Sequence, residues 1–149
     1  MQPRLNPYKL APGAYQALSA MQSYVEKCDL EPKLMELVKI RASQINGCAF
    51  CLAMHTRDAI KLGESQDRLF LLNAWDEVDI YTPRERAALA WTEAVTLVSN
   101  GHVPDAVFED VRKEFSEVEL VNLNMAVIAI NAWNRMAIAF RAQPKLDGN

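Results

Sequence analysis

Apolar residues recur at every third or fourth position through nearly the whole chain, and no segment alternates apolar and polar residues as a strand would. This period is typical of amphipathic helices, so the sequence predicts an all-α fold, a compact bundle of six to seven helices. Helical segments are expected over residues 14–28, 32–46, 48–62 and 65–73, from 83 to about 99, from 104, and from 116 to 141.

Capping residues define several of these boundaries. Thr82, Pro83 and Glu85 have the pattern of a capping box with proline at the first helical position, and Ser116 with Glu119 forms a second box. Glycine after a periodic segment predicts a helix end, and glycines stand at positions 47, 63 and 101.

The chain has 149 residues with short connections, no internal repeat and no linker, which favours a single domain over residues 1–149. The first 11 residues (1–11) contain two prolines and are expected to form an arm on the surface or on a neighbouring subunit.

The last helix is apolar on most sides, from Val121 to Phe140, which is more than a helix facing water needs. We therefore expect a homo-oligomer, with this helix central to one subunit or at an interface. Its asparagines then need partners, and we expect hydrogen bonds across helices. An alternative is that Asn131 or Arg135 lines a substrate pocket.

Composition and charge exclude some partners. The formal net charge is −3 and no segment is strongly basic, so nucleic acid is not an expected partner. The N-terminus lacks the apolar core of a secretory signal, and polar residues interrupt the most apolar segment, residues 125–140. We expect a cytoplasmic protein with no membrane partner.

Three cysteines are too few for a disulfide scaffold and favour catalysis or metal binding.

Two of those cysteines share a helix face with a histidine. Cys48, Cys51 and His55 are spaced by three and four residues, so all three point to one side of the expected helix. Both thiols stand at its start, just after Gly47, where free backbone N–H groups and the helix dipole favour a thiolate. Position in the first turn favours Cys48 as the more acidic thiol, whereas the adjacent imidazole favours Cys51.

Glu36 is a candidate partner of the histidine. If the second and third helices form a hairpin at Gly47, Glu36 lies about 16 Å from the turn and His55 about 12 Å, at 1.5 Å per residue. This geometry pairs Glu36 with His55 better than with either sulfur. A carboxylate behind a histidine orients the ring and raises its basicity.

Other interpretations remain open at this point. Cys48, Cys51 and His55 could bind structural zinc with Glu36 or His102 as a fourth ligand, or the cysteines could be inert core residues. Cys28 lies on the apolar stripe of its own helix and is interpreted as a small buried hydrophobic residue.

The run of Glu36, eleven residues, then Cys-x-x-Cys-x-x-x-His resembles the core motif of the alkylhydroperoxidase D and carboxymuconolactone decarboxylase superfamily. The segment RASQINGCAFCLAMHTRDA is similar to its redox-active branch, as is the late NAWNRMAIAFR. The resemblance covers residues 30–140. It implies an alkylhydroperoxidase D-like fold, assembly into trimers or hexamers, and peroxidase activity without haem, flavin or metal.

The resemblance also implies roles. Cys51 would attack the peroxide, Cys48 would donate a proton and then close the disulfide, and Glu36 with His55 would relay protons. The substrate would be hydrogen peroxide or a small organic hydroperoxide, and a dithiol of thioredoxin or lipoyl type would return the electrons. Phe50 stands where the best-known peroxidase of the family has a histidine, which leaves the reductant open. A general disulfide reductase, or a redox-sensing or zinc-binding oligomer, is the alternative.

Overall fold

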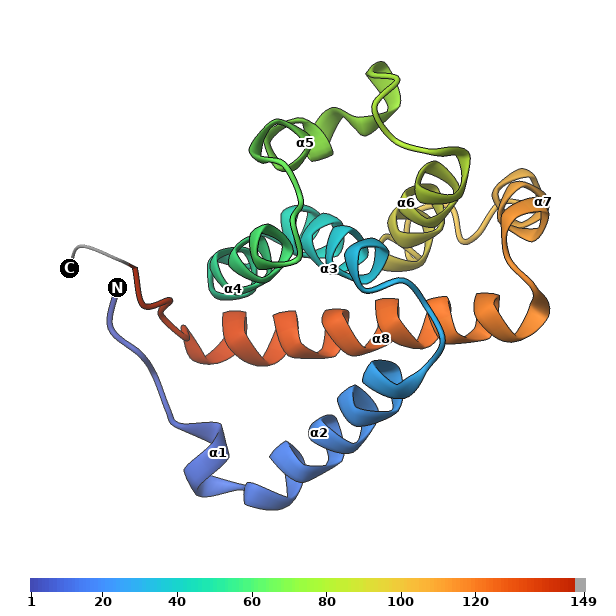
Figure 1. Ribbon diagram of the computed structural model, residues 1–149. Coiled ribbons are helices and arrows are strands. Elements are labelled where there is room, and N and C mark those ends of the chain that lie inside the picture. Colours follow the sequence, from blue (N-terminus) through green and yellow to red (C-terminus); the bar gives the residue numbers. More distant parts are fainter. Residues whose placement is uncertain (147–149) are drawn as a thin grey trace.

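The computed structural model describes residues 1–146, and every regular element in that range is a helix, as the periodicity predicts (Figure 1). The elements are α1 (Pro7–Leu10), α2 (Pro12–Lys27), α3 (Pro32–Asn46), α4 (Ala49–Lys61), α5 (Gln66–Leu71), the 3₁₀-helix η1 (Leu72–Glu77), α6 (Pro83–Thr96), α7 (Asp105–Glu114) and α8 (Glu117–Phe140).

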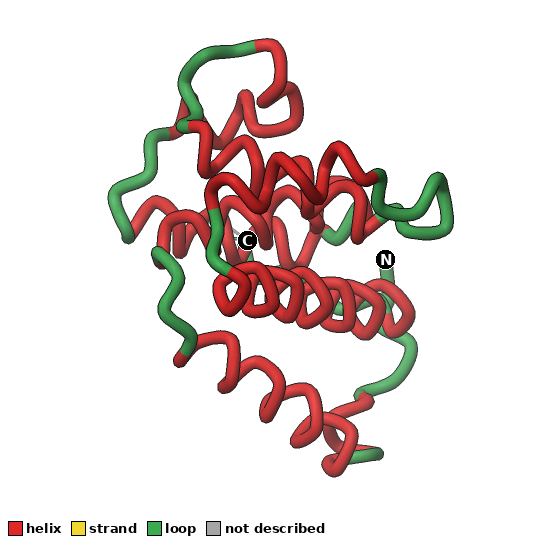
Figure 2. Tube along the Cα trace, turned by 90° about the vertical axis from the view of Figure 1, so that its right-hand side faces the viewer, coloured by secondary structure: helices red, strands yellow, loops and turns green. Residues whose placement is uncertain are grey.

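Helix α8 lies at the centre of the arrangement. Figures 1 and 2 both show α3, α4 and α6 on one side of α8 and α2 on the other. Helices α2, α3, α4, α6 and α7 all contact it and cover its buried apolar positions, whereas Val118, Val121, Ile128 and Ile138 of α8 stay exposed. The helix is thus central within one subunit, which is one of the positions that its apolar sides allow.

Three groups of buried side chains hold the helices together. The largest joins α2, α3, α6, α7 and α8, and a second joins α3 and α6 to α4, α5 and η1. The third and smallest lies between α3, α4 and α8, and contains Ala42, Cys48, Cys51, Ile130 and Ala137. The two cysteines therefore belong to the packed interior of the protein.

Both capping boxes predicted from the sequence are present. The Thr82 and Ser116 hydroxyls accept hydrogen bonds from the N–H groups of Glu85 and Glu119, whose carboxylates accept from the N–H groups of the two capping residues. These local hydrogen bonds need no tertiary contact, so the sequence pattern is sufficient to locate the starts of α6 and α8.

Two regions differ from the expected helix pattern. The arm (residues 1–11) contains the four-residue helix α1, which Asn6 caps by accepting the N–H of Lys9 at 3.1 Å. The segment expected as one helix over 65–73 is divided into α5 and η1. Ala74, inside η1, has non-helical dihedral angles, so the chain kinks there.

Asparagines form a hydrogen-bonded group between α3 and α8. Asn46 Nδ2 donates to Asn131 Oδ1 at 3.0 Å and to Asn134 Oδ1 at 2.9 Å. Asn134 Nδ2 donates to Ser43 Oγ at 3.0 Å, and Asn131 Nδ2 donates to Thr96 Oγ1 at 3.0 Å. The predicted bonds across helices are confirmed at these positions, and they satisfy polar groups that burial would otherwise leave unpaired.

Near the N-terminal end of α3, Arg84 of α6 joins several segments. Its guanidinium binds Glu31 at 2.8 Å, Glu119 at 2.6 Å and the backbone oxygen of Glu114, and it stacks over the Phe115 ring at 3.9 Å. The start of α3, the start of α6, the end of α7 and the start of α8 are connected through this one side chain.

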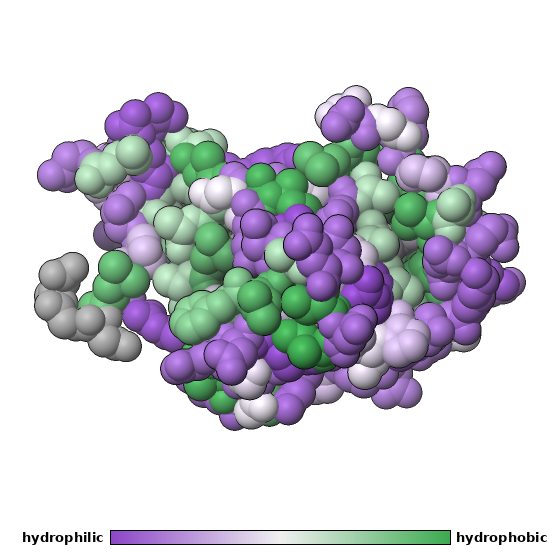
Figure 3. Space-filling model, turned by 90° about the horizontal axis from the view of Figure 1, so that it is seen from above, coloured by the Kyte–Doolittle hydropathy of each residue, from purple (hydrophilic) through white to green (hydrophobic). Residues whose placement is uncertain are grey.

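The surface is mixed in character. Seen from the α5 side, hydrophobic patches are interrupted by hydrophilic side chains (Figure 3). Phe70 of α5 is 77% exposed and is the most exposed aromatic side chain of the described part of the chain. No helix within residues 1–146 has the length and apolar character needed to cross a membrane.

Candidate active site

The turn between α3 and α4 positions the cysteine pair. Gly47 ends α3 in the left-handed conformation (φ 67°), and Cys48 follows in an extended conformation as the N-cap of α4. The helix therefore begins at Ala49, one residue later than the pattern indicates. The Cys48 sulfur accepts the backbone N–H of Cys51 at 3.5 Å, so it occupies the place that a serine or aspartate oxygen takes at other helix starts.

This position makes Cys48 the more acidic thiol. A hydrogen bond from the Cys51 thiol lowers the pKa of Cys48 to about 7 against the effect of burial, and the N–H groups of Cys51 and Phe50 act in the same direction. The pKa of Cys51 is raised, because its proton is held by Cys48, its side chain is buried, and Cys48 carries the negative charge. These surroundings agree with the preference expected from first-turn position, which places the charge of the pair on Cys48.

Asn134 lies against both sulfurs. It is fully buried, one helical turn from Ile130 and from Ala137, the α8 residues that pack on the cysteines. Its Oδ1 accepts from Asn46 and its Nδ2 donates to Ser43, which fixes the amide orientation. The Asn134 side chain lowers the pKa of Cys48 and opposes the rise in the pKa of Cys51. It therefore stabilises negative charge on the pair.

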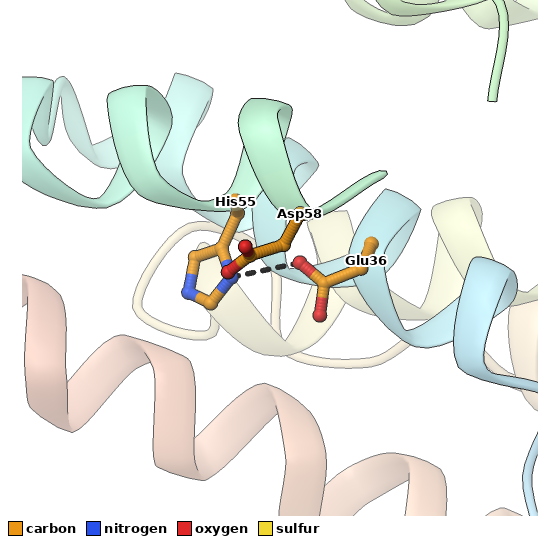
Figure 4. A group of neighbouring side chains, drawn as sticks. All are labelled: Glu36, His55 and Asp58. Atoms are coloured by element: carbon orange, nitrogen blue, oxygen red, sulfur yellow. Dashed lines mark hydrogen bonds and ion pairs between the residues drawn. The ribbon is translucent and has the colours of Figure 1, made fainter. Parts of the chain in front are cut away.

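The predicted hydrogen bond between Glu36 and His55 is present. Glu36 of α3 and His55 of α4 face each other across the helical hairpin, with 2.8 Å between Oε2 and Nδ1 (Figure 4). Burial raises the pKa of Glu36, but hydrogen bonds from His55 and Lys39 outweigh it and lower the pKa below its usual value. An ionised carboxylate only accepts, so Nδ1 carries the hydrogen and Nε2 remains available to exchange a proton.

A second carboxylate lies beside the pair. Figure 4 shows Asp58, one turn along α4, next to the imidazole, and donor atoms of Glu36, His55 and Asp58 lie within 4.8 Å of one another. The other oxygen of Glu36 binds the Lys39 ammonium at 2.7 Å, and this positive charge competes with any metal ion there. The clustered donors include neither Cys48 nor Cys51, so they do not match the zinc set considered from the sequence.

A cavity of about 660 Å³ opens beside this group, between the α1–α2 side of the molecule and α3, α4 and α8. Cys51, His55 and Glu36 line it, and Cys48 is not among its lining residues. The remaining lining residues are Tyr8, Tyr15, Gln22, Glu26, Lys39, Phe50, Met54, Asp58, Trp133 and Ala137. Only one sulfur of the pair thus faces the space that a substrate can enter.

The remaining candidates lie elsewhere. Cys28 caps the end of α2, is half-buried, and donates its thiol hydrogen to the Val25 oxygen at 2.8 Å, and burial raises its pKa. This agrees with its interpretation as a packing residue, although it is less buried than expected. His102 is exposed in the turn between α6 and α7.

Sequence reasoning missed several residues of the site. Lys39 stands three residues after Glu36, and Asp58 stands three residues after His55, so helical spacing could have indicated both. Tyr8 and Tyr15 carry no sequence signal for the site, because only the path of α1 and α2 over α8 brings them to it.

An all-helical chain with a Cys-x-x-Cys pair at a helix start, beside a buried Glu–His pair, has the architecture of the AhpD-like proteins. Residues 12–94, more than half of the chain, match the carboxymuconolactone decarboxylase family, and the chain belongs to that family.

Similar proteins agree with this assignment. The uncharacterized protein YdfG of Bacillus subtilis (strain 168) is 42% identical over 139 residues, which are 93% of this chain and 95% of YdfG. A crystal structure of ATU0492 from Agrobacterium tumefaciens, a protein of unknown function proposed as an antioxidant defence protein AhpD, is 41% identical with a TM-score of 0.95. That comparison covers 98% of this chain and all of ATU0492.

A more distant structure shares the fold alone. The debrominase Bmp8 is 18% identical to this chain, with a TM-score of 0.77 over 90% of this chain and 72% of Bmp8. The fold therefore occurs in proteins with different chemistry, and the activity has to be argued from the site.

Proposed function

We propose that this protein is a thiol-dependent peroxidase that reduces hydrogen peroxide or organic hydroperoxides through a Cys48–Cys51 dithiol–disulfide cycle. The family and fold favour a peroxidase-related, antioxidant role. The observation that carries the finer proposal is that one cysteine of the pair is the more acidic thiol and the other faces the cavity. Cys48 has a pKa of about 7, and its partner Cys51 faces the cavity together with His55.

In the first step, the Cys51 sulfur attacks the terminal oxygen of the hydroperoxide R–O–OH. An S–O bond forms and the O–O bond breaks, which leaves Cys51 as a sulfenic acid and releases RO⁻. The Cys51 proton passes to Nε2 of His55 and from there to RO⁻, which departs as the alcohol. Because the proton leaves as the new bond forms, the two sulfurs do not carry negative charge together.

In the second step, the Cys48 thiolate attacks the Cys51 sulfur. An S–S bond forms, the S–O bond breaks, and the departing hydroxide takes a proton from solvent to become water. An external dithiol then reduces the disulfide and is itself oxidised to a disulfide. Glu36 holds Nδ1 of His55 throughout, so Nε2 stays directed away from the carboxylate.

The test is to map the three cysteines by mass spectrometry after one equivalent of peroxide. We expect a Cys48–Cys51 disulfide with Cys28 still reduced. In Cys48→Ser, a sulfenic acid should persist at Cys51 and react with dimedone, whereas Cys51→Ser should give no sulfenic acid. Cys28→Ser is the matched control and should behave as the unmodified protein.

Three other outcomes would replace this proposal. Dimedone labelling of Cys48 in the Cys51→Ser variant would exchange the roles of the two sulfurs. Thiols that stay reduced with peroxide but reduce a model disulfide would indicate a general disulfide reductase. Thiols that are inert toward both would favour the redox-sensing or zinc-binding alternative, and metal content of the purified protein would identify the zinc form.

A further inference from the structure

The cavity beside Cys51 is much larger than hydrogen peroxide requires. A water molecule accounts for roughly 30 Å³ of liquid, and a peroxide of two oxygen atoms is little bigger. The cavity has a volume of about 660 Å³, within the range typical of sites for organic ligands. Most of this space is therefore available to the organic part of a substrate whose peroxide group lies at the sulfur.

Aromatic side chains from three helices form one side of the cavity. Tyr8 of α1 and Tyr15 of α2 meet edge to face with 4.9 Å between ring centroids and 74° between planes. Tyr15 meets Trp133 of α8 in the same way, at 5.8 Å and 64°. Edge-to-face contacts of this kind extend readily to a further ring, because each ring presents an electron-rich face and a positive edge.

The reactive groups and the aromatic side chains line the same space. Cys51 and His55 of α4 line it together with Phe50 and Met54 of the same helix, whose side chains are apolar. The pKa of Tyr8 is raised first by burial, then by Tyr15, and further by the charges of Cys51 and Cys48, so Tyr8 lies near both cysteines. A substrate whose peroxide group reaches Cys51 would thus have its organic part among these aromatic side chains.

The charges on the cavity lining further restrict which substrates fit. Three carboxylates line the cavity (Glu26, Glu36 and Asp58), against one ammonium, Lys39. Lys39 is already paired with Glu36 at 2.7 Å. The remaining negative charge disfavours an anionic substrate such as a fatty-acid hydroperoxide, since no unpaired cation of the lining is available to hold its carboxylate.

We propose that this cavity selects uncharged hydroperoxides that carry an aromatic ring, which binds against Tyr15 and Trp133 while the peroxide group reaches Cys51. The inference rests on the proposed peroxidase function and narrows its substrate class. The reaction is the one written above, with R an arylalkyl group that leaves as the corresponding alcohol.

The test compares rate constants for thiol oxidation by cumene hydroperoxide, tert-butyl hydroperoxide and hydrogen peroxide. The unmodified protein should react fastest with cumene hydroperoxide. In Tyr15→Ala the ratio of the cumene to the hydrogen peroxide rate constant should fall about tenfold, and Tyr15→Phe should restore it, because the ring and not the hydroxyl makes the contact. Tyr15 is 45% exposed, so its loss leaves the packed core intact.

The matched control is Tyr24→Ala. Tyr24 lies on the same helix, is 52% exposed, and does not line the cavity, so the ratio should stay as in the unmodified protein. A ratio that is unchanged in Tyr15→Ala, or that falls equally in Tyr24→Ala, would overturn the inference. So would a preference of the unmodified protein for tert-butyl hydroperoxide.

Binding without chemistry separates this inference from the proposed function. The alcohol product 2-phenyl-2-propanol should change the fluorescence of Trp133 on binding, and this change should be absent in Trp133→Phe. The similarly sized anion 2-phenylpropionate should bind at least about tenfold more weakly. If no peroxide oxidises the pair, the peroxidase function fails, whereas equal binding of the two compounds, or no binding of the alcohol, overturns the substrate class.

Discussion

At the scale of single residues, Cys48 and Cys51 are three positions apart and have opposite electrostatic surroundings. Cys48 Sγ receives hydrogen bonds from Cys51 and from backbone N–H groups, so its pKa falls to about 7. Cys51 holds its proton and faces the cavity. The negative charge of the pair thus lies on the sulfur away from the cavity, and the sulfur that lines the cavity keeps its proton. Asn134 of α8, which is fully buried, lowers the pKa of both thiols and so stabilises negative charge on the pair.

We predict that Asn134→Leu raises the pKa of the first thiol ionisation of the pair by on the order of one unit, because an apolar group of similar size donates nothing to the sulfurs. The measurement is the rate of iodoacetamide alkylation as a function of pH. The unmodified protein should show a rise centred near pH 7. In the variant this rise should move to higher pH.

Asn131→Leu is the control, since Asn131 bonds to Asn46 and Thr96 in the same polar group of side chains. It makes the same substitution on the same helix without removing a group that acts on the sulfurs. Equal shifts in both variants would mean that Asn134 acts only by keeping the helices in place.

At the scale of elements, the α3–α4 hairpin assembles the site, and its turn depends on Gly47. This residue has φ 67°, and a Cβ added there would meet nothing within 4 Å. The requirement for glycine is therefore one of backbone conformation and not of space. The turn fixes how α3 and α4 face each other, and with them Glu36 and His55.

Gly47→Ala should accordingly lower the free energy of unfolding by about 1 kcal/mol, the cost of a left-handed conformation for a residue with a Cβ. Gly47→Asn should cost less, because asparagine tolerates this conformation. Urea denaturation provides the measurement. Gly13→Ala, in the first turn of α2 with equally open space, should be neutral or stabilising. A loss of stability at position 13 as large as at position 47 would contradict the explanation.

Much of this element-level structure could be predicted from the sequence. The capping boxes at Thr82 and Ser116 and the hydrogen bond between Glu36 and His55 follow from spacing along one helix or across one hairpin. The role of Cys48 as N-cap was missed by one position, because the pattern does not distinguish the capping residue from the first helical one.

What the sequence could not predict depends on how distant helices approach one another. Tyr8 and Tyr15 reach the cavity because α1 and α2 pass along the side of α8 opposite α3 and α4. The contact of Asn134 with the sulfurs requires the rotation of α8 about its own axis. Neither quantity is encoded in the spacing of apolar residues on a single helix.

At the scale of the whole molecule, the site and the connections between helix ends are separate. The asparagine group and the cysteines lie between α3, α4 and α8. Arg84 instead links the starts of α3, α6 and α8 to the end of α7 through Glu31, Glu119 and Glu114. Its planar guanidinium makes several bonds at once and also stacks on Phe115, which an ammonium group cannot reproduce.

Arg84→Lys should therefore lower the free energy of unfolding by about 1–2 kcal/mol, while the pH dependence of thiol alkylation stays unchanged. Chemical denaturation and alkylation on the same samples test both parts. Arg112→Lys is the control, because Arg112 makes one ion pair, with the exposed Glu117 at 3.2 Å. It should change stability by less than about 0.5 kcal/mol. A large shift in thiol pKa in Arg84→Lys would show that the two regions are coupled.

The position of Cys48 as N-cap has a consequence for the reaction cycle. In the proposed cycle, the thiolate that caps the first turn of α4 is also the group consumed when the disulfide forms, and an uncharged disulfide sulfur is a poor acceptor for the Cys51 N–H. Each turnover would then release the start of α4, and its backbone amides would exchange with solvent faster in the oxidised protein than in the reduced one. The reductant would thus meet a frayed, more open helix end, and reduction would close it again.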